Sequence, residues 1–257
     1  MIFNSYTFLV FLIIVLAVNR FLPGWNARKF FLLVVSYLFY AAWNPPFVLL
    51  LVFSTVLDWF LARWLYRVQA AGPRRVLVVL SLAANLGLLG FFKYGNFLLD
   101  NLQFISAWLG QPMTKQHLNI ILPVGISFYT FQTLSYTLDV YRRQMPPARS
   151  FLDYCLYVTF FPQLVAGPIV RASDFIPQCE SPRSATSRQL GWGLVLLVVG
   201  LFNKVVVADT LMAPVVDLAY RSTGSLGFGD AWLGTFAFAT QIFCDFAGYS
   251  TCAIGVA

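Results

Sequence analysis

The stretch FFLLVVSYLFYAAWNPPFVLLLVFSTVL, residues 30–57, decides the fold because it is apolar and carries no charged side chain. The Asn44-Pro45-Pro46 step interrupts it. Consecutive prolines end a helix, and asparagine before proline favours a turn. The stretch therefore predicts two membrane-spanning helices joined by a tight turn, the second of which continues to about Tyr66.

The composition of the whole chain leads to the same class of protein. Of its 257 residues, 59% are hydrophobic and 11% are charged, whereas ordinary globular domains have roughly 45–50% apolar and about 25% charged residues. A soluble protein with so few charges could not cover its own surface. The composition excludes a typical cytosolic enzyme, a disordered chain and a secreted disulfide scaffold, and it predicts an all-α, polytopic integral membrane protein.

Basic residues between the apolar runs indicate the orientation. The charge-free run Met1–Asn19 predicts an uncleaved first span, and Arg20 and Arg28 follow it. A second basic loop extends from Arg63 to Arg75, before the fourth apolar run, Val76–Phe92. By the positive-inside rule both loops face the cytoplasm and the N-terminus faces the periplasm or exterior. The net charge of +7 is therefore interpreted as a topology signal and not as a sign of nucleic-acid binding.

The later apolar segments are less regular. We expect Tyr94–Leu109 to be amphipathic and to lie in the membrane interface if it does not span. Leu118–Leu138 is expected to enter the cytoplasm as a span. Tyr154–Val170 contains two prolines and a glycine between basic flanks, which predicts a re-entrant or broken segment. Gly191–Ala208 leads outward again, and Ala231–Gly255 is the last apolar run.

Asp245 is the strongest candidate for chemistry. A carboxylate inside an apolar span costs ~2.5–3.5 kcal/mol on insertion scales, so it must face a polar cavity, a partner or a ligand. Nearby, Gly248 allows a close helix approach, and Tyr249 and Ser250 add hydrogen-bond donors. A functional carboxylate and a buried one that is satisfied by hydrogen bonds to neighbouring helices both fit this pattern.

Other polar positions favour structural interpretations. Lys204 and Asp209, beside Asn203, form a second polar pair that the pattern favours as a helix end at the interface. Asp58 is favoured as a carboxylate near the cytoplasmic interface beside an aromatic belt. His117 is the only histidine, so no multi-histidine metal site can form, and a solvated loop position is favoured over catalysis. The four cysteines show no Cys-x-x-Cys spacing and predict structural roles.

Four segments together carry a resemblance to a known family. They are LPVGISFYTF (Leu122–Phe131), FFPQLVAGPI (Phe160–Ile169), NKVVVAD (Asn203–Asp209) and DFAGYS (Asp245–Ser250). Their order and spacing resemble the membrane-bound O-acyltransferase family and, within it, the alginate O-acetyltransferase branch. The resemblance extends over the whole chain, although Thr251 and Cys252 depart from the pattern that the family usually has.

The resemblance implies an enzyme of the bacterial inner membrane with about seven to nine transmembrane or re-entrant helices around a central funnel. It implies that an acetyl group passes from a cytoplasmic donor, acetyl-CoA or another acyl thioester, to periplasmic relay proteins and an exopolysaccharide such as alginate. No bound cofactor, metal or nucleic acid is expected. The candidates for lining the funnel are Asp245, Tyr249, Ser250, Gln163, Asn203 and Lys204.

The resemblance places the catalytic histidine, a general base, in a Trp-Arg-Arg-Trp-His type segment beyond Ala257. The last apolar run also reaches Ala257 without a polar stop. We therefore expect residues 1–257 to be one partial transmembrane domain that is inactive alone.

Two alternatives come from other classes: a transporter component and a non-catalytic scaffold for exopolysaccharide export. The buried charges and the broken segment suit substrate passage, but the inverted repeat of many transporters is not visible.

Overall fold

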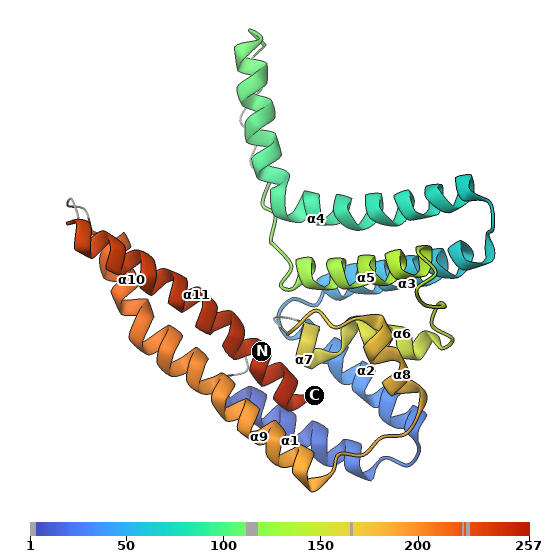
Figure 1. Cartoon of the computed structure of the whole chain (residues 1–257). Helices are drawn as coiled ribbons and strands as arrows, with labels where there is room; N and C mark the ends of the chain where they lie inside the picture. The colour runs from blue at the N-terminus through green and yellow to red at the C-terminus, as the bar shows by residue number, and fades with distance from the viewer. Residues whose placement is uncertain (1–3, 112–117, 165–166, 223, 225–226) are drawn as a thin grey trace. The chain divides into compact units, whose positions relative to one another are not determined.

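The structure, a computed structural model, describes residues 4–111, 118–164, 167–222, 224 and 227–257. Within these residues all regular structure is helical, which confirms the all-α part of the predicted class (Figure 1). The helices form two compact units. Residues 1–43, 160–169 and 181–257 make up the first unit, and residues 44–159 and 170–180 make up the second.

The first unit is built around a long helical hairpin. Its elements are α1 (Tyr6–Phe21), α2 (Trp25–Ala41), α7 (Phe161–Leu164), α9 (Ser187–Leu201), η1 (Phe202–Met212), α10 (Ala213–Tyr220) and α11 (Phe228–Val256). The helices α9, η1 and α10 follow one another without a break, and α11 packs along them as the other arm (Figure 1).

Glycines bring the two arms of this hairpin into backbone contact. A Cβ atom added to Gly200 on α9 would lie 2.6 Å from the carbonyl oxygen of Gly248 on α11 and 2.6 Å from the Cys252 sulfur. The same holds further along, where a Cβ on Gly193 would lie 2.7 Å from the Gly255 carbonyl oxygen. Small residues allow close helix packing of this kind inside membranes, where no hydrophobic effect drives helices together.

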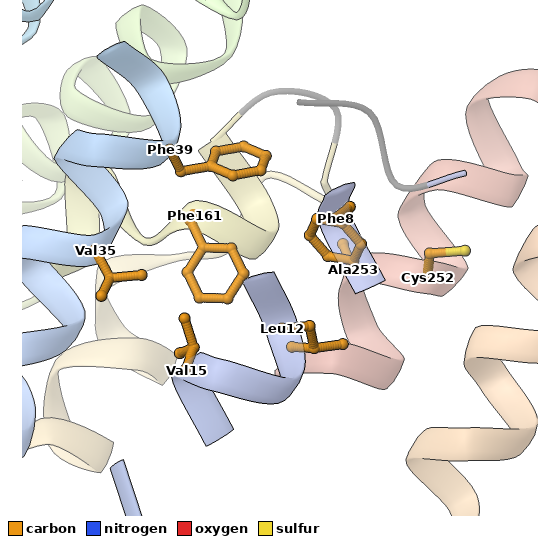
Figure 2. Packing of buried hydrophobic residues seen from close by; sticks show 8 residues of the cluster. All are labelled: Phe8, Leu12, Val15, Val35, Phe39, Phe161, Cys252 and Ala253. Atoms are coloured by element: carbon orange, nitrogen blue, oxygen red, sulfur yellow. The ribbon is translucent and has the colours of Figure 1, made fainter. Parts of the chain in front are cut away.

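A buried hydrophobic cluster joins α1, α2, α7 and α11 in the first unit. Figure 2 shows its side chains: Phe8, Leu12, Val15, Val35, Phe39, Phe161, Cys252 and Ala253. The Phe161 ring lies 5.6 Å from the Phe39 ring and makes an edge contact with Phe11 at 5.3 Å. The backbone N–H of Phe161 donates to the Ser36 hydroxyl at 3.1 Å. These contacts hold the short helix α7 in place, because its first backbone donor is satisfied within the core.

The second unit packs α3 (Phe47–Arg67) against α4 (Ala71–Trp108) and α5 (Ile126–Tyr141), together with the shorter helices α6 (Phe151–Thr159) and α8 (Ala172–Glu180). The prediction of a break at Asn44-Pro45-Pro46 is confirmed, since α2 ends at Ala41 and α3 begins at Phe47.

Two predicted boundaries in this unit are wrong. Tyr94–Leu109 is not a separate segment, because α4 continues to Trp108 and only bends on the way (Figure 1). A lone glycine such as Gly95 costs about 1 kcal/mol in a helix and does not end it. The helix expected over Leu118–Leu138 begins only at Ile126. Pro123 disfavours helix in the residue before it, and Gly125 has a left-handed φ of 75°.

The segment Tyr154–Val170 is broken, as predicted. Helix α6 ends at Thr159, α7 covers one turn, and Gly167 to Val170 is not helical. Whether the segment re-enters the membrane stays a prediction.

Three helical stretches of the described residues are long and apolar enough to cross a membrane. They are Phe47–Arg67, Ala71–Trp108 and Ser187–Tyr220. The α1 helix is apolar but shorter, and its side chains Leu9 and Ile13 are at least half exposed. Exposed apolar helix faces of this kind match a lipid environment.

We predict that Gly200→Ala destabilises the protein, because its methyl group would push α11 away by overpacking, at a cost of about 1–3 kcal/mol. The measurement is thermal unfolding in detergent, followed by circular dichroism. Gly191→Ala on α9 is the matched control, since a Cβ there has no atom within 4 Å and alanine favours helix. Equal melting temperatures for the two variants would contradict the close contact.

Candidate functional site

The η1 segment is a π-helix of 11 residues in the middle of the helical stretch Ser187–Tyr220. In a π-helix the backbone bonds span five residues, so residues i and i+5 come together, whereas an α-helix pairs i with i+3 or i+4. The Lys204 Nζ lies 2.8 Å from Asp209 Oδ1, and the Thr210 hydroxyl donates to the Val205 carbonyl at 2.7 Å. Both pairs have the spacing of five. The π register therefore places Asp209 beside Lys204.

The same ammonium group reaches across the hairpin. Lys204 Nζ also forms an ion pair with Asp245 on α11, and it lies 5.2 Å from the centre of the Tyr249 ring. Gly248 is located between Asp245 and Tyr249 in sequence, and a Cβ there would lie 2.9 Å from the Lys204 backbone nitrogen. The lack of a side chain at Gly248 thus allows α11 to come close enough for the ion pair.

The geometry leaves the carboxylates accessible. The Lys204 side chain is 14% exposed, whereas those of Asp209 and Asp245 are 42% and 43% exposed. One ammonium faces two carboxylates, so one negative charge is in excess when all three are ionised. A carboxylate facing hydrocarbon would be costly, which means that this side of the hairpin must face water or other polar groups. We call Lys204, Asp209, Asp245 and Tyr249 the charged cluster.

The charged cluster can act on a polar ligand in two ways. The half-exposed carboxylates can accept hydrogen bonds from a hydroxyl group, and the ammonium can stabilise negative charge that develops nearby. The interpretation of Lys204 and Asp209 as a helix end is wrong, because the helix continues through η1 and α10 to Tyr220. The sequence did not indicate the contact between Lys204 and Asp209, because residues five apart are not neighbours on an α-helix.

The remaining funnel candidates lie on three elements of the first unit. Asn203 precedes Lys204 on η1 and is half-buried, and Ser250 follows Tyr249 on α11 and is also half-buried. Gln163 is buried on α7, at 6% exposure. The structure thus brings Lys204 and Asp245 together with Tyr249, and the role of all six residues in a funnel stays a prediction.

An open apolar cavity of about 480 Å³ lies within the first unit between the start of α1 and the junction of α9 with η1. Leu9 and Leu12 line one wall, and Leu201 and Val205 line the other. Val205 follows Lys204, so an apolar groove and the charged cluster share one turn of helix.

Asp58 is completely buried in the second unit, at 0% exposure, and its predicted position near the cytoplasmic interface stays a prediction. Its carboxylate accepts hydrogen bonds from the Ser81 hydroxyl at 2.6 Å and from the Asn85 side chain at 2.8 Å, both on α4. The Ser54 hydroxyl donates to Asn85 at 2.7 Å. This network ties α3 to α4 through polar groups that are satisfied away from water.

A sequence signal for this network exists. Ser54 and Asp58 are four residues apart on α3, and Ser81 and Asn85 are four apart on α4, so each pair lies on one face of an apolar helix. Polar groups on one face of each of two helices predict a contact between them, but single positions considered alone do not reveal it.

His117 lies outside the described residues. Cys155, Cys179 and Cys252 are buried free thiols, which agrees with structural roles. In the described part of the chain no group of three His, Cys, Asp or Glu side chains is arranged to hold a metal ion.

The fold and the charged cluster together define a helical protein with membrane-length apolar helices that carries a polar site within a helix hairpin. Residues 36–257 match the membrane-bound O-acyltransferase family, and the chain belongs to that family.

Curated relatives are similar over most or all of this chain. A probable alginate O-acetylase of Pseudomonas aeruginosa is 38% identical over 261 residues, which cover 100% of this chain and 49% of the relative. A peptidoglycan O-acetyltransferase of Helicobacter pylori is 37% identical over 89% of this chain and 47% of the relative. A teichoic acid D-alanyltransferase of Lacticaseibacillus rhamnosus is 25% identical over 56% of this chain and 38% of the relative. The chain thus spans about half the length of the curated relatives that it matches over its whole length.

We predict that Asp58→Ala destabilises the protein by about 2–4 kcal/mol, since the Ser81 and Asn85 donors would stay buried without an acceptor. Thermal unfolding in detergent measures this effect. The control is Asp217→Ala on α10, where the side chain is 57% exposed and pairs with Arg221 at the surface, so that the change should stay within about 0.5 kcal/mol. A small effect at Asp58 would contradict the buried network.

Proposed function

We propose that this chain belongs to a membrane O-acetyltransferase that passes acetyl groups to hydroxyl groups of an extracytoplasmic polysaccharide. The observation that carries the proposal is the charged cluster, which lies in the two segments NKVVVAD and DFAGYS and sets accessible carboxylates beside an ammonium. Membership of the O-acyltransferase family and the similarity to named O-acetylases support it. The choice between alginate, peptidoglycan and another polymer is left to experiment.

In this proposal each residue of the charged cluster has a stated task. Lys204 keeps the Asp245 carboxylate oriented toward the passage and lies where it can stabilise negative charge on the acyl carbonyl. Asp245 accepts a hydrogen bond from the acceptor hydroxyl or from the group that carries the acetyl, and Tyr249 adds a further donor. Gln163, Asn203 and Ser250 line the same funnel.

The proposal also covers the setting of the reaction. The acyl donor is acetyl-CoA or another acyl thioester on the cytoplasmic side, and periplasmic relay proteins take the acetyl group onward. The whole protein lies in the bacterial inner membrane with its N-terminus in the periplasm, and about seven to nine transmembrane or re-entrant helices surround the funnel.

The experiment joins residues 1–257 to the part of the Pseudomonas aeruginosa relative that its alignment with this chain leaves out. The joined protein is expressed in a strain that lacks the relative, and the O-acetyl content of the secreted alginate is measured. We predict acetylated alginate, and a loss of roughly tenfold or more when Asp245→Asn removes the charged partner of Lys204.

The matched control is Asp217→Asn, which removes a carboxylate outside the charged cluster and should leave acetylation unchanged. Membrane levels of all variants are compared by immunoblot. A scaffold or a transporter component would give no acetylated polymer, or acetylation that does not depend on Asp245, at normal membrane levels. Either result would contradict the proposal.

A further inference from the structure

One end of the second unit is rich in basic residues, and Asp139 in the last turn of α5 is the acidic residue nearest to Arg143 in sequence. Arg67 ends α3, Arg74 and Arg75 lie near the start of α4, and Arg142 and Arg143 follow α5. No Asp or Glu occurs between positions 58 and 100 or between positions 139 and 153. The local field at this end therefore favours an anion.

Two hydrogen bonds hold the basic segments together, although these segments are about seventy residues apart in sequence. The Arg74 guanidinium donates to the Tyr141 carbonyl and lies 5.2 Å from the centre of the Tyr141 ring. The Arg143 guanidinium donates to the side-chain carbonyl of Gln69. These hydrogen bonds connect the α3–α4 turn to the end of α5 and form a corner between them.

A cavity of about 300 Å³ opens in this corner and is lined by Tyr66, Gln69, Arg143, Gln144, Met145 and Pro146. Its polar lining consists of a phenol, two amides and a guanidinium, all of which can donate hydrogen bonds, and it contains no carboxylate. Guanidinium groups bind phosphate oxygens through paired hydrogen bonds.

The backbone conformation at Arg143 is one that costs free energy for a residue with a Cβ atom. The N–H of Gln144 bonds to the Asp139 carbonyl at 2.9 Å, and the N–H of Arg143 bonds to the Val140 carbonyl at 3.1 Å. This is the glycine-type helix ending in which the residue after the cap is left-handed. Arg143 occupies that position with a φ of 59°, where glycine would avoid the steric penalty of a Cβ. A helix end alone does not require arginine there.

The surroundings of the pocket are typical of a membrane–water interface. Helix α3 is long and apolar enough to cross a membrane, and the pocket forms where it ends. Trp64 and Tyr66 in its last turn are 57% and 46% exposed, and exposed aromatic residues of this kind gather at the membrane–water interface. Basic pockets at helix ends bind anionic headgroups by charge and hydrogen bonds.

We propose that this pocket binds a phosphate group through Arg143 and Gln69. The phosphate belongs either to the headgroup of an anionic phospholipid or to a soluble phosphate ester, since both present the same oxygens. The proposal does not depend on the acetyl-transfer function, because it rests on the second unit alone.

The experiment compares the unmodified protein with Arg143→Gly and Arg142→Gly. The first arm measures retention of phosphatidylglycerol from mixed phosphatidylcholine nanodiscs by native mass spectrometry. The second arm titrates inorganic pyrophosphate into protein held in a neutral detergent. Arg142→Gly is the matched control, because it removes the same charge from the same loop but does not touch the pocket lining.

We expect Arg143→Gly to weaken binding roughly tenfold or more in the arm where the unmodified protein binds, and Arg142→Gly to change it only about threefold or less. The melting temperature of Arg143→Gly should change little, because glycine suits the left-handed position and this gain offsets the loss of the hydrogen bond to Gln69. Binding only in the first arm identifies a lipid headgroup, and binding only in the second identifies a soluble phosphate ester.

Two results would overturn the proposal. The first is the absence of binding by the unmodified protein in both arms. The second is an equal loss in the two variants, which would mean that the general charge of the loop attracts the anion.

Discussion

The close approach of two helix backbones at Gly200 and Gly248 is the constraint on which the first unit depends. Each glycine leaves no room for a methyl group, and only at this separation can Lys204 reach Asp245 on the other arm. The π-helical register then supplies Asp209 as a second partner. A buried cation is costly without such partners. The close packing of the hairpin is therefore what allows a charged lysine at this position.

In the second unit, too, a buried charged group is satisfied by partners on a neighbouring helix, but without an ion pair. Asp58 is satisfied by neutral donors from α4, and the network has no exposed member at its centre because Asp58, Ser81 and Asn85 are all buried. Such a network specifies how two apolar helices pair. The charged cluster differs because its carboxylates stay accessible, and accessibility is what a site for a polar ligand requires.

The sequence predicts those features of the fold that local chemistry determines. The Asn44-Pro45-Pro46 step locates the break between α2 and α3 correctly, and the prolines and glycine of Tyr154–Val170 predict its break. The start of α2 was placed too late, because the helix begins at Trp25 and includes Arg28, before the charge-free run. The start of α5 was missed because absence of charge marks apolarity but not helix, and Pro123 and Gly125 delay the helix by eight residues relative to Leu118. Lys204 and Asp245 could be named as candidates, but their contact could not, because the spacing along η1 follows a rare register and the pair joins two arms of a hairpin.

The most direct measurement is the distance between the Lys204 ammonium nitrogen and the Asp245 carboxyl carbon in lipid bilayers, by solid-state nuclear magnetic resonance on selectively labelled protein. The account predicts a dipolar coupling that corresponds to about 4 Å or less, as in an ion pair, and its loss in a Gly248→Leu variant. A coupling too weak to detect in the unmodified protein, with its fold intact, would contradict the view that glycine packing and charge pairing together build this site.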